Sequence, residues 1–481
     1  MAKRRIIAGL LAGAFVFSTP ASAETLKEAL ARAYFDNPTL AAARANLRAT
    51  DENVVIQRSQ GLPGVDATGS FSELLQQSTP AVVSPERLIR GNVSLNVPVY
   101  QGGAVRNGIL AAENRVEAGR ADLRGTESAV FAQVVAAYMD VILNEALVSL
   151  SANNVDVLAI NLQATSDRFE IGDLTRTDVA QSQSRLALAE GDLESSRANL
   201  IEARERYLQL TGAPPIDLQA PPPLPGLPAS PDGAVDVALE YNPDIIAARE
   251  NAEAAGFDVE VAGSGRLPRL SLFASSDYQN FLGTLPSGNN AGTDLTVGAQ
   301  ISIPIFQGGR PAAQQRQAGA FASAALENAI AVERSVIAQV RAAFSSWRAA
   351  RAVIVSSEVA VDAAALSLEG VRAENTVGNR TVLDILDAQQ ELLNAQTQLV
   401  TARRNAYVAG FSLLAAMGRA EARDLGLEDE GPLYDPIDNY DRVRGIIWDW
   451  QRDLEPAVES ARTVDIPAQD GEISADIPAG D

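Results

Sequence analysis

The strongest constraint on the fold of this 481-residue chain is an internal duplication. An Asn-Pro pair at residues 37–38 recurs at 242–243, and the run PVYQGG at 98–103 recurs as PIFQGG at 304–309. The offsets are 205 and 206 residues, and the landmarks keep the same order. One structural unit therefore occurs twice, and we expect a fold with two equivalent halves.

The regions that flank the duplication indicate a targeting segment, a linker and a tail. Three basic residues, Lys3 to Arg5, precede an apolar run and a small-residue cleavage site that ends at Ala23, which is the pattern of a signal peptide. We therefore expect an exported chain. The predicted segments are a signal peptide (1–23), a first structural repeat (24–212), a Pro-rich linker (213–231), a second structural repeat (232–420) and an acidic, largely disordered tail (421–481).

The negative charge is concentrated in the tail. The chain has a net charge of −22, and residues 421–481 alone carry 17 acidic residues against five arginines. The rest of the sequence has no basic stripe that would follow a phosphate backbone, so we expect no nucleic-acid partner. After the signal peptide we expect no window apolar enough for a helical membrane span.

Each half contains stretches with the two-residue period of β-strands. Apolar and polar residues alternate over 92–99 and 295–305, and a weaker alternation covers 65–71 and 270–278. We therefore expect four strands per chain. Four strands cannot close a barrel, and open sheet edges are not tolerated in lipid, so strands that span a membrane require several copies of the chain. Three copies would supply twelve strands.

Long helical patterns follow the strands. The first runs from residue 104 to about 170 and the second from 311 to about 375, roughly 100 Å each at 1.5 Å per residue. Gly172 and Gly378 then reverse the chain into return helices. The residues therefore predict a fold that is mainly α with a small β part, in which two strands per half are joined to tandem-duplicated long antiparallel helices that pack as a coiled coil.

Two glycines stand at each predicted strand-to-helix junction. Glycine adopts backbone conformations that other residues avoid, and it therefore permits a sharp change of direction. We expect turns at Gly102, Gly103, Gly308 and Gly309.

The chain contains neither cysteine nor histidine. This excludes disulfides, lipidation on cysteine, Cys/His metal or haem sites and Ser-His-Asp triads. We expect no metal, no cofactor and no enzymatic activity. Asp384 and Asp387 are the pair to weigh as acid/base catalysts, but residues at i and i+3 of one exposed helix do not oppose each other across a substrate.

The duplicated strand, the Gln-Gly-Gly turn, the long helix and the run VGNRTVLDILDA at 377–388 resemble the TolC family of outer-membrane efflux and secretion channels. The resemblance covers about residues 25–420. It implies a homotrimer in which four strands per chain contribute to a trimeric twelve-stranded β-barrel in outer-membrane lipid, continued by a coiled-coil α-barrel that forms a tunnel through the periplasm. It also implies docking of the helix tips at Gly172 and Gly378 to a periplasmic adaptor protein and an inner-membrane RND or ABC transporter, with small toxic compounds, proteins or both as cargo.

The same resemblance assigns roles to side chains near the glycine reversals. Asp384 and Asp387 would form an acidic ring at the periplasmic entrance, and such rings favour cations. Asp178 and Arg380 would belong to polar links that hold the entrance closed. Asn375 falls where the best-known efflux member has an aromatic partner in this gate latch, so the latch here is expected to be paired differently.

Two alternatives remain open. A dedicated type I protein secretion duct would share all these features and would differ in its cargo. A periplasmic adaptor protein also uses long helical hairpins, but it predicts a membrane or lipid anchor and one hairpin flanked by compact β modules. The two equivalent halves of this chain favour the channel.

Overall fold

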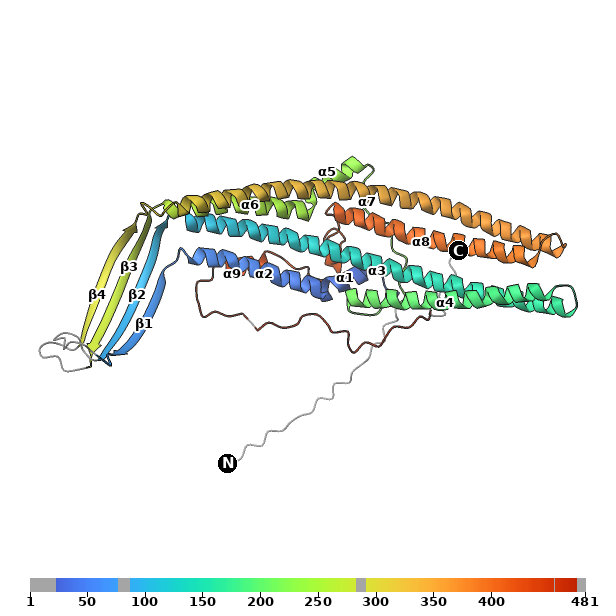
Figure 1. The fold of residues 1–481 in the computed structure, drawn as a ribbon, viewed down its shortest axis with the longest axis horizontal. Coiled ribbons are helices and arrows are strands. Elements are labelled where there is room, and N and C mark those ends of the chain that lie inside the picture. The colour runs from blue at the N-terminus through green and yellow to red at the C-terminus, as the bar shows by residue number, and fades with distance from the viewer. Residues whose placement is uncertain (1–22, 77–86, 283–290, 454, 474–481) are drawn as a thin grey trace, which may run out of the picture.

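The computed structural model describes residues 23–76, 87–282, 291–453 and 455–473. Residues 1–22 of the predicted signal peptide lie outside this set. The molecule is elongated: a small β-sheet forms one end, and long helices run from it to the other end (Figure 1). The mainly helical fold with a small β part is therefore confirmed.

Four antiparallel strands form one sheet, namely β1 (Gly64–Glu73), β2 (Arg87–Gln101), β3 (Arg269–Phe281) and β4 (Ala291–Ser302). Their order in the sheet is the order in the sequence, so β1 and β4 each leave one edge unpaired. The predicted strands are present, but β4 ends at Ser302 and not near Ile305. Its partner β3 begins at Arg269, directly after Pro268, which has no N–H to donate to a continued ladder.

The strand register gives the sheet one polar and one apolar face. Paired residues share a face, and successive residues along a strand alternate between faces. One polar row consists of Asp66, Ser94, Ser275 and Thr296. The neighbouring row, on the opposite face, consists of Val65, Leu95, Ala274 and Val297. A sheet with one apolar and one polar face is typical of a β-barrel wall that separates lipid from water.

The helices repeat in the same order in both halves, as the duplication predicts. Each half has a short helix, a second helix that follows an Asn-Pro pair, a very long helix and a return helix. They are α1 (Leu26–Asp36), α2 (Pro38–Ser59), α3 (Ala104–Glu170) and α4 (Arg176–Thr211), then α5 (Pro231–Tyr241), α6 (Pro243–Gly263), α7 (Arg310–Thr376) and α8 (Val382–Ala416).

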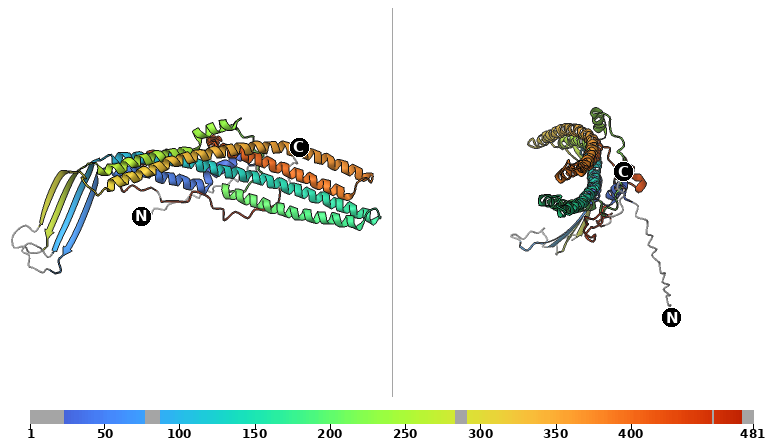
Figure 2. Two further views of the ribbon diagram at one scale, coloured as in Figure 1. Left: turned by 45° about the horizontal axis from the view of Figure 1, so that its top comes forward. Right: turned by 90° about the vertical axis from the view of Figure 1, so that its right-hand side faces the viewer.

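The long helices form a single curved layer. Near the sheet the neighbouring helices are α2, α3, α6 and α7, in that order; farther away they are α4, α3, α8 and α7. Seen from the far end, this layer is an arc with a concave and a convex side (Figure 2). α3 lies inside the layer and buries 20 residues, whereas α7 lies at its edge and buries six.

The strand-to-helix turns at Gly102, Gly103, Gly308 and Gly309 are as predicted. All four glycines have positive φ, from 60° to 86°, in the left-handed region that other residues rarely adopt. Gly102 is also tightly packed, because a Cβ there would lie 2.9 Å from the Cβ of Leu267.

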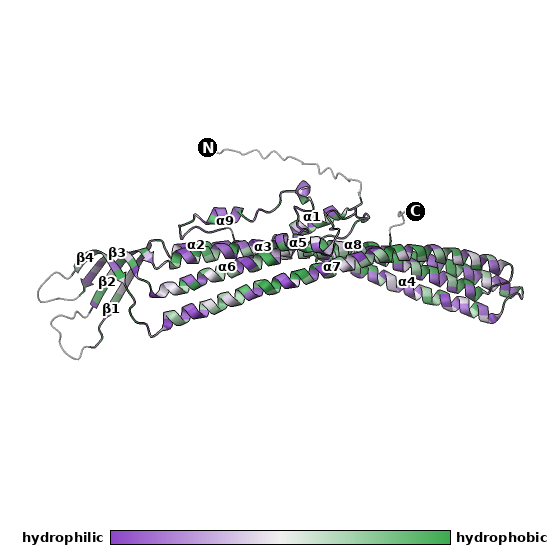
Figure 3. Ribbon diagram, turned by 90° about the horizontal axis from the view of Figure 1, so that it is seen from above, coloured by the Kyte–Doolittle hydropathy of each residue, from purple (hydrophilic) through white to green (hydrophobic). Residues whose placement is uncertain are grey.

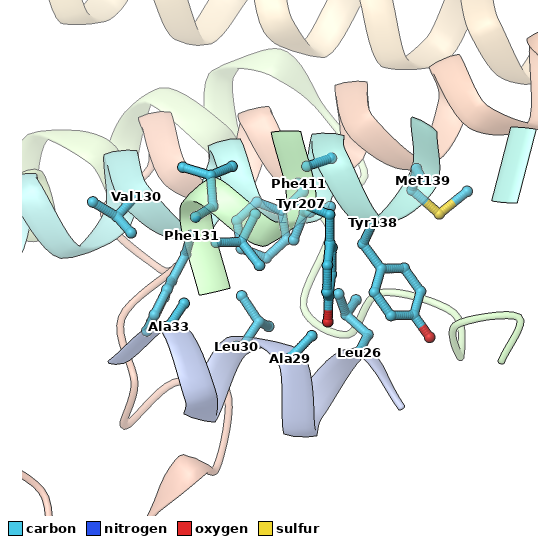
Figure 4. Packing of buried hydrophobic residues seen from close by; sticks show 14 of the residues in the cluster. Leu26, Ala29, Leu30, Ala33, Val130, Phe131, Tyr138, Met139, Tyr207 and Phe411 are labelled. Atoms are coloured by element: carbon cyan, nitrogen blue, oxygen red, sulfur yellow. The ribbon is translucent and has the colours of Figure 1, made fainter. Parts of the chain in front are cut away.

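The main hydrophobic core lies where α1 packs on the middle of α3 and the ends of the return helices. Leu30 and Ala33 of α1 meet Phe131 of α3, Tyr207 of α4 and Phe411 of α8 (Figure 4). The hydroxyl of Tyr138 donates hydrogen bonds to the carbonyl oxygens of Glu24 and Gln219, at 2.9 and 2.7 Å, which ties the Pro-rich linker to this core. The two repeats are thus joined at mid-length.

The expectation that no later segment resembles a membrane span is wrong for α3. This helix contains an 18-residue window with mean hydropathy 1.5, which by length and composition could cross a membrane. Apolar and polar residues alternate along the helices in Figure 3. The residues of α3 from Val130 to Val148 supply many of the buried side chains of the main core, and 39% of the apolar window is buried inside the chain.

The duplicated Asn-Pro pairs have the same structural role in both repeats. Asn37 caps α2 through a hydrogen bond from the N–H of Thr39 (2.9 Å), and its side-chain amide donates to the carbonyl oxygen of Leu210 (2.9 Å). Asn242 caps α6, and its amide donates to the carbonyl oxygen of Ala416 (2.9 Å). Each asparagine therefore joins the start of one helix to the end of the return helix.

The described part of the acidic tail differs from the disordered segment that its composition predicts. Residues 421–453 and 455–473 lie along the first repeat, with a 3₁₀ turn at Leu427–Glu430 and a short helix, α9 (Asp438–Val443). Leu427 is fully buried in the main core, and the N–H of Tyr434 donates to the hydroxyl of Tyr34 at 2.9 Å. Apolar and aromatic residues spaced along the tail pack on the first repeat, and the high net charge of the tail gives no indication of these contacts.

Candidate functional site

The end of the molecule farthest from the sheet consists of two similar helix reversals. α3 turns into α4 around Gly172, and α7 turns into α8 around Gly378 (Figure 1). These glycines have φ of 81° and 82°, and nothing lies within 4 Å of where a Cβ would project. Both tips are therefore exposed, and glycine is needed there for the backbone turn and not for close packing.

Asp178 and Asp384 occupy matching positions in the two repeats. Each lies in the first turn of a return helix, α4 or α8, and helps to cap it. Thr175 and Thr381 are the N-cap residues, and each makes a capping box with the Asp three residues later. The hydroxyl-to-carboxylate distance is 2.7 Å in both tips. Hydrogen bonds from the threonines hold the pKa of both carboxyl groups below the ordinary aspartate value.

Arg380 gathers the polar groups at the second tip. Its guanidinium lies 2.7 Å from the carboxylate of Glu374 and 3.8 Å from that of Asp384. The side-chain amide of Asn375 donates to the carbonyl oxygen of Arg380 at 2.7 Å. The hydrogen bond to Glu374 is the main reason that the pKa of Arg380 is raised. Asn375, Arg380 and Asp384 are thus brought together within one chain.

Asp387 connects the two return helices. Its carboxylate accepts a hydrogen bond from the guanidinium of Arg185 in α4, at 2.7 Å. Beneath this ion pair Leu386 packs against Leu158 and Ala189, which are buried residues of α3 and α4. The α7–α8 hairpin is therefore fastened to the α3–α4 hairpin near the tips by one exposed ion pair and one small apolar cluster.

The latch residues fall into two separate groups. Asp178 is engaged by its own cap at the first tip, and among the described residues it forms no hydrogen bond or ion pair with Arg380. Arg185 and Glu374, the partners of Asp387 and Arg380, are missing from the sequence prediction. The Thr-x-x-Asp capping pattern is visible in the sequence, whereas Arg185 is 202 residues from Asp387 and no local pattern links them.

Within the described ranges, no group of three or more acidic side chains is placed to hold a metal ion. Asp178 and Asp384 accept hydrogen bonds from their threonine N-caps, Asp387 is paired with Arg185, and Asp384 lies beside Arg380. The tips are therefore charged, hydrogen-bonded ends of the helical layer.

A two-faced sheet at one end and a long curved helical layer at the other define the class of channel-forming outer-membrane proteins with a periplasmic helical extension. A family model described as "Outer membrane efflux protein" matches residues 26–213 and 234–419. The chain belongs to this family, and the TolC-family prediction is confirmed. The protein is therefore a channel of the outer membrane that extends into the periplasm.

Individual relatives and structures agree with this assignment. The outer membrane efflux protein BepC of Brucella suis biovar 1 (strain 1330) is 35% identical over 435 residues, which cover 90% of this chain and 94% of BepC. The alkaline protease secretion protein AprF of Pseudomonas aeruginosa is 28% identical over 311 residues, 63% of this chain and 64% of AprF. The crystal structure of the Campylobacter jejuni CmeC outer membrane channel superposes with a TM-score of 0.73 at 16% identity, covering 92% of this chain and 98% of CmeC.

Proposed function

We propose that three copies of the chain assemble into the working channel. The observation that carries this proposal is the open four-stranded sheet, whose β1 and β4 edges are unpaired although its apolar face requires lipid. Pairing β1 of one copy with β4 of the next closes a twelve-stranded barrel. The helical arcs then close into a tunnel. A molecular mass of three chains for the detergent-solubilised protein would support the proposal, and a stable monomer would contradict it.

The helix tips at Gly172 and Gly378 are the proposed docking points for a periplasmic adaptor protein and an inner-membrane RND or ABC transporter. Their matched geometry supports this role, because a trimer presents six similar, exposed tips to a partner. The channel itself is proposed to be passive and to need no cofactor and no enzymatic activity. Tip substitutions that abolish export but leave the trimer and its conductance unchanged would support docking.

Asp384 and Asp387 are proposed to set the ion preference of the periplasmic entrance. Three copies would present six carboxylates at this level, and a ring of carboxylates attracts cations. The capping hydrogen bonds keep Asp384 ionised to lower pH than an unpartnered aspartate, which opposes the rise in pKa that a ring of like charges produces. Asp178, Arg380 and Asn375 are proposed as latch residues that hold the entrance closed.

The proposed cargo is small toxic compounds, proteins or both. The likeness to BepC, an efflux protein by name, over 90% of the chain supports efflux. The likeness to AprF, a protease secretion protein by name, supports a type I secretion duct as the second candidate. The channel gene would be deleted in its own host, and the susceptibility to dyes, detergents and antibiotics compared with the protein content of the medium.

The two candidates predict different results in this experiment. Efflux predicts higher susceptibility with unchanged secreted protein. A dedicated secretion duct predicts loss of one or a few secreted proteins with normal susceptibility. A shared role predicts both effects, and no effect on either would overturn the proposed cargo.

A further inference from the structure

The segment that follows α9 exposes large apolar side chains to an unusual degree. In the loop of residues 443–453, here called the tryptophan loop, Ile447, Trp448 and Trp450 are 69%, 68% and 78% exposed. The whole chain contains three tryptophans, so two of the three lie in this loop. Contiguous apolar side chains of this size on a protein surface mark a site of interaction.

The tryptophan loop is a built structure and not a loose connection. At its base the guanidinium of Arg442 and the carboxylate of Asp453 form two parallel hydrogen bonds, at 2.9 and 2.8 Å. A turn at its tip is closed by the N–H of Gln451, which donates to the carbonyl oxygen of Trp448 at 3.2 Å. A bidentate Arg–carboxylate pair fixes geometry as well as distance. The apolar side chains are therefore presented from a closed loop.

The position of the loop is fixed by contacts of α9 with the first repeat. Asn439 donates a hydrogen bond to buried Asp51 of α2 at 2.7 Å, and the ring of Tyr440 lies 5.4 Å from the guanidinium of Arg120 in α3. Arg58, in the last turn of α2, donates a hydrogen bond to the carbonyl oxygen of Arg444. The loop therefore lies at the end of the helical layer that adjoins the sheet.

The distance from this point to the membrane is short. Gly64, where β1 begins, is six positions after Arg58 along the chain, and six residues reach at most about 20 Å. After α9 the chain approaches the sheet before it turns back along the molecule (Figures 1 and 3). It does so on the outer, convex side of the helical arc (Figure 2). The loop is thus placed outside the tunnel, near the level at which the strands leave the membrane.

The chemistry of the loop matches the boundary between lipid and water. Tryptophan is enriched at membrane interfaces, where its ring is apolar and its N–H is polar. Arg442, Arg444 and Arg452 are accompanied by Asp441, Asp449 and Asp453, and two of the arginines are paired with Asp453 and Asp441, so the loop and its base carry no net charge. Exposed Tyr100 and Phe306, 48% and 88% exposed, stand at the same end of the sheet.

We propose that the tryptophan loop is a membrane anchor, which inserts Ile447, Trp448 and Trp450 into the periplasm-facing leaflet of the outer membrane. The partner is the lipid–water interface of a phospholipid leaflet. In a closed assembly each copy would add one anchor outside the barrel, and these anchors would fix the depth and tilt at which the barrel sits. This proposal concerns a segment outside the tunnel and does not depend on the cargo.

The test uses the full chain reconstituted in phospholipid vesicles that contain an anionic lipid, with or without bromine in the acyl chains. Bromine quenches tryptophan fluorescence on contact. A Trp347→Phe variant leaves Trp448 and Trp450 as the only tryptophans, whose emission is excited selectively at wavelengths that tyrosine does not absorb. Trp347 packs on Phe344 in the helical layer, with ring centres 5.8 Å apart, and a phenyl ring preserves an aromatic contact there. We expect the tryptophan emission of this variant to lie at a shorter wavelength than that of tryptophan in water. In brominated vesicles most of this emission should be lost.

The matched control is Trp448→Phe with Trp450→Phe, which leaves only Trp347, and its emission should not respond to brominated lipid. If Trp347→Phe does not fold, the difference between the native chain and this double variant reports the same quantity. Quenching by a water-soluble quencher but not by brominated lipid would mean that the loop remains in solvent. Quenching by neither would mean that protein covers it, as a second copy would. Either result overturns the proposal.

Discussion

At the scale of single residues, Asp384 both caps a helix and carries charge, and one substitution would remove both functions at once. Its carboxylate accepts hydrogen bonds from the N–H and hydroxyl of Thr381, and it also carries negative charge at the exposed tip. Loss of an N-terminal cap costs about 0.5–2 kcal/mol, so a change in channel behaviour after mutation of Asp384 could arise from a frayed helix. A comparison with Thr381 separates the two effects.

We predict that Asp384→Ala combined with Asp387→Ala raises single-channel conductance and abolishes block by divalent cations. Thr381→Ala removes the cap but keeps both carboxylates, and it should retain the block. Planar-bilayer recordings on the three proteins provide the measurement. Equal loss of cation block in both variants would assign the effect to helix fraying and not to charge.

Glu127 predicts a pH dependence of stability. Burial in α3 raises its pKa from 4.5 to about 7, although a hydrogen bond from the N–H of Ala422 acts in the opposite direction. The negative charge of Glu421 adds to the rise, and the positive charges of Arg44 and Arg124 oppose it. Between pH 4.5 and about pH 7 the carboxyl group of Glu127 is therefore protonated in the folded chain and ionised in the unfolded chain. Stability is greatest below the unfolded pKa and falls as pH rises through the folded one, by about 3 kcal/mol at most.

Glu127→Gln should remove this pH dependence, because an amide oxygen still accepts from Ala422 but does not titrate. Thermal unfolding followed by circular dichroism at about pH 5 and about pH 8 tests it. We expect the variant to match the native protein at the lower pH and to unfold at a higher temperature at the upper one. A parallel pH dependence in both proteins would contradict the assignment to Glu127.

At the scale of elements, each of the two return helices is followed by a glycine. The two glycines occupy equivalent positions in the sequence but differ in their surroundings. Gly212 and Gly418 have φ of 76° and 71°, so any other residue at either position would carry the backbone cost of a left-handed conformation. A Cβ at Gly212 would meet nothing closer than 3.9 Å, whereas at Gly418 it would lie 2.4 Å from the carbonyl oxygen of Tyr241. The end of α8 is therefore pressed against the α5–α6 junction.

We predict that Gly212→Ala costs about 1–2 kcal/mol, from backbone strain alone. Gly418→Ala should cost clearly more and should loosen the hydrogen bond from Asn242 to Ala416, because backbone cannot move aside as a flexible side chain can. Hydrogen exchange of the last turns of α4 and α8 in the two variants measures this directly. Equal protection in both would show that the close contact has no energetic effect.

The elements themselves were predictable because their signals are local. Two-residue and helical periods, Asn-Pro starts and Gly-Gly turns identify α2, α3, α6, α7 and all four strands within a few residues. Contacts between distant segments carry no such signal. The pairing of Arg185 with Asp387 depends on how α4 packs on α8, and the order of the tail depends on Leu427 and Tyr434 finding places on the first repeat.

At the scale of the whole molecule, the edge helix α7 tests the proposed assembly. Val355 and Val359 are 63% and 65% exposed and lie one turn apart, away from the buried face of α7. Burial of a valine side chain contributes about 1.5–3 kcal/mol. We therefore predict that Val355→Asp with Val359→Asp shifts the detergent-solubilised protein from trimer to monomer, as measured by light scattering.

Val464→Asp is the matched control for this prediction, because Val464 is 79% exposed but lies in the tail. It should leave the mass of the assembly unchanged. If the α7 variant also retained the mass of a trimer, the contacts between copies would have to lie elsewhere along the helical layer.

The route of the tail has a mechanical consequence. Among the described residues, the polar contacts from residues 427–473 to the helices all go to α1 through α4, as in the ion pairs of Asp429 with Lys27 and Asp470 with Arg204. The tail thus holds α1, α2 and the adjoining parts of α3 and α4 together, whereas no described residue of 427–473 makes a polar contact with α7 or α8. Around a closed ring, sectors that the tail stiffens would therefore alternate with sectors that it does not touch.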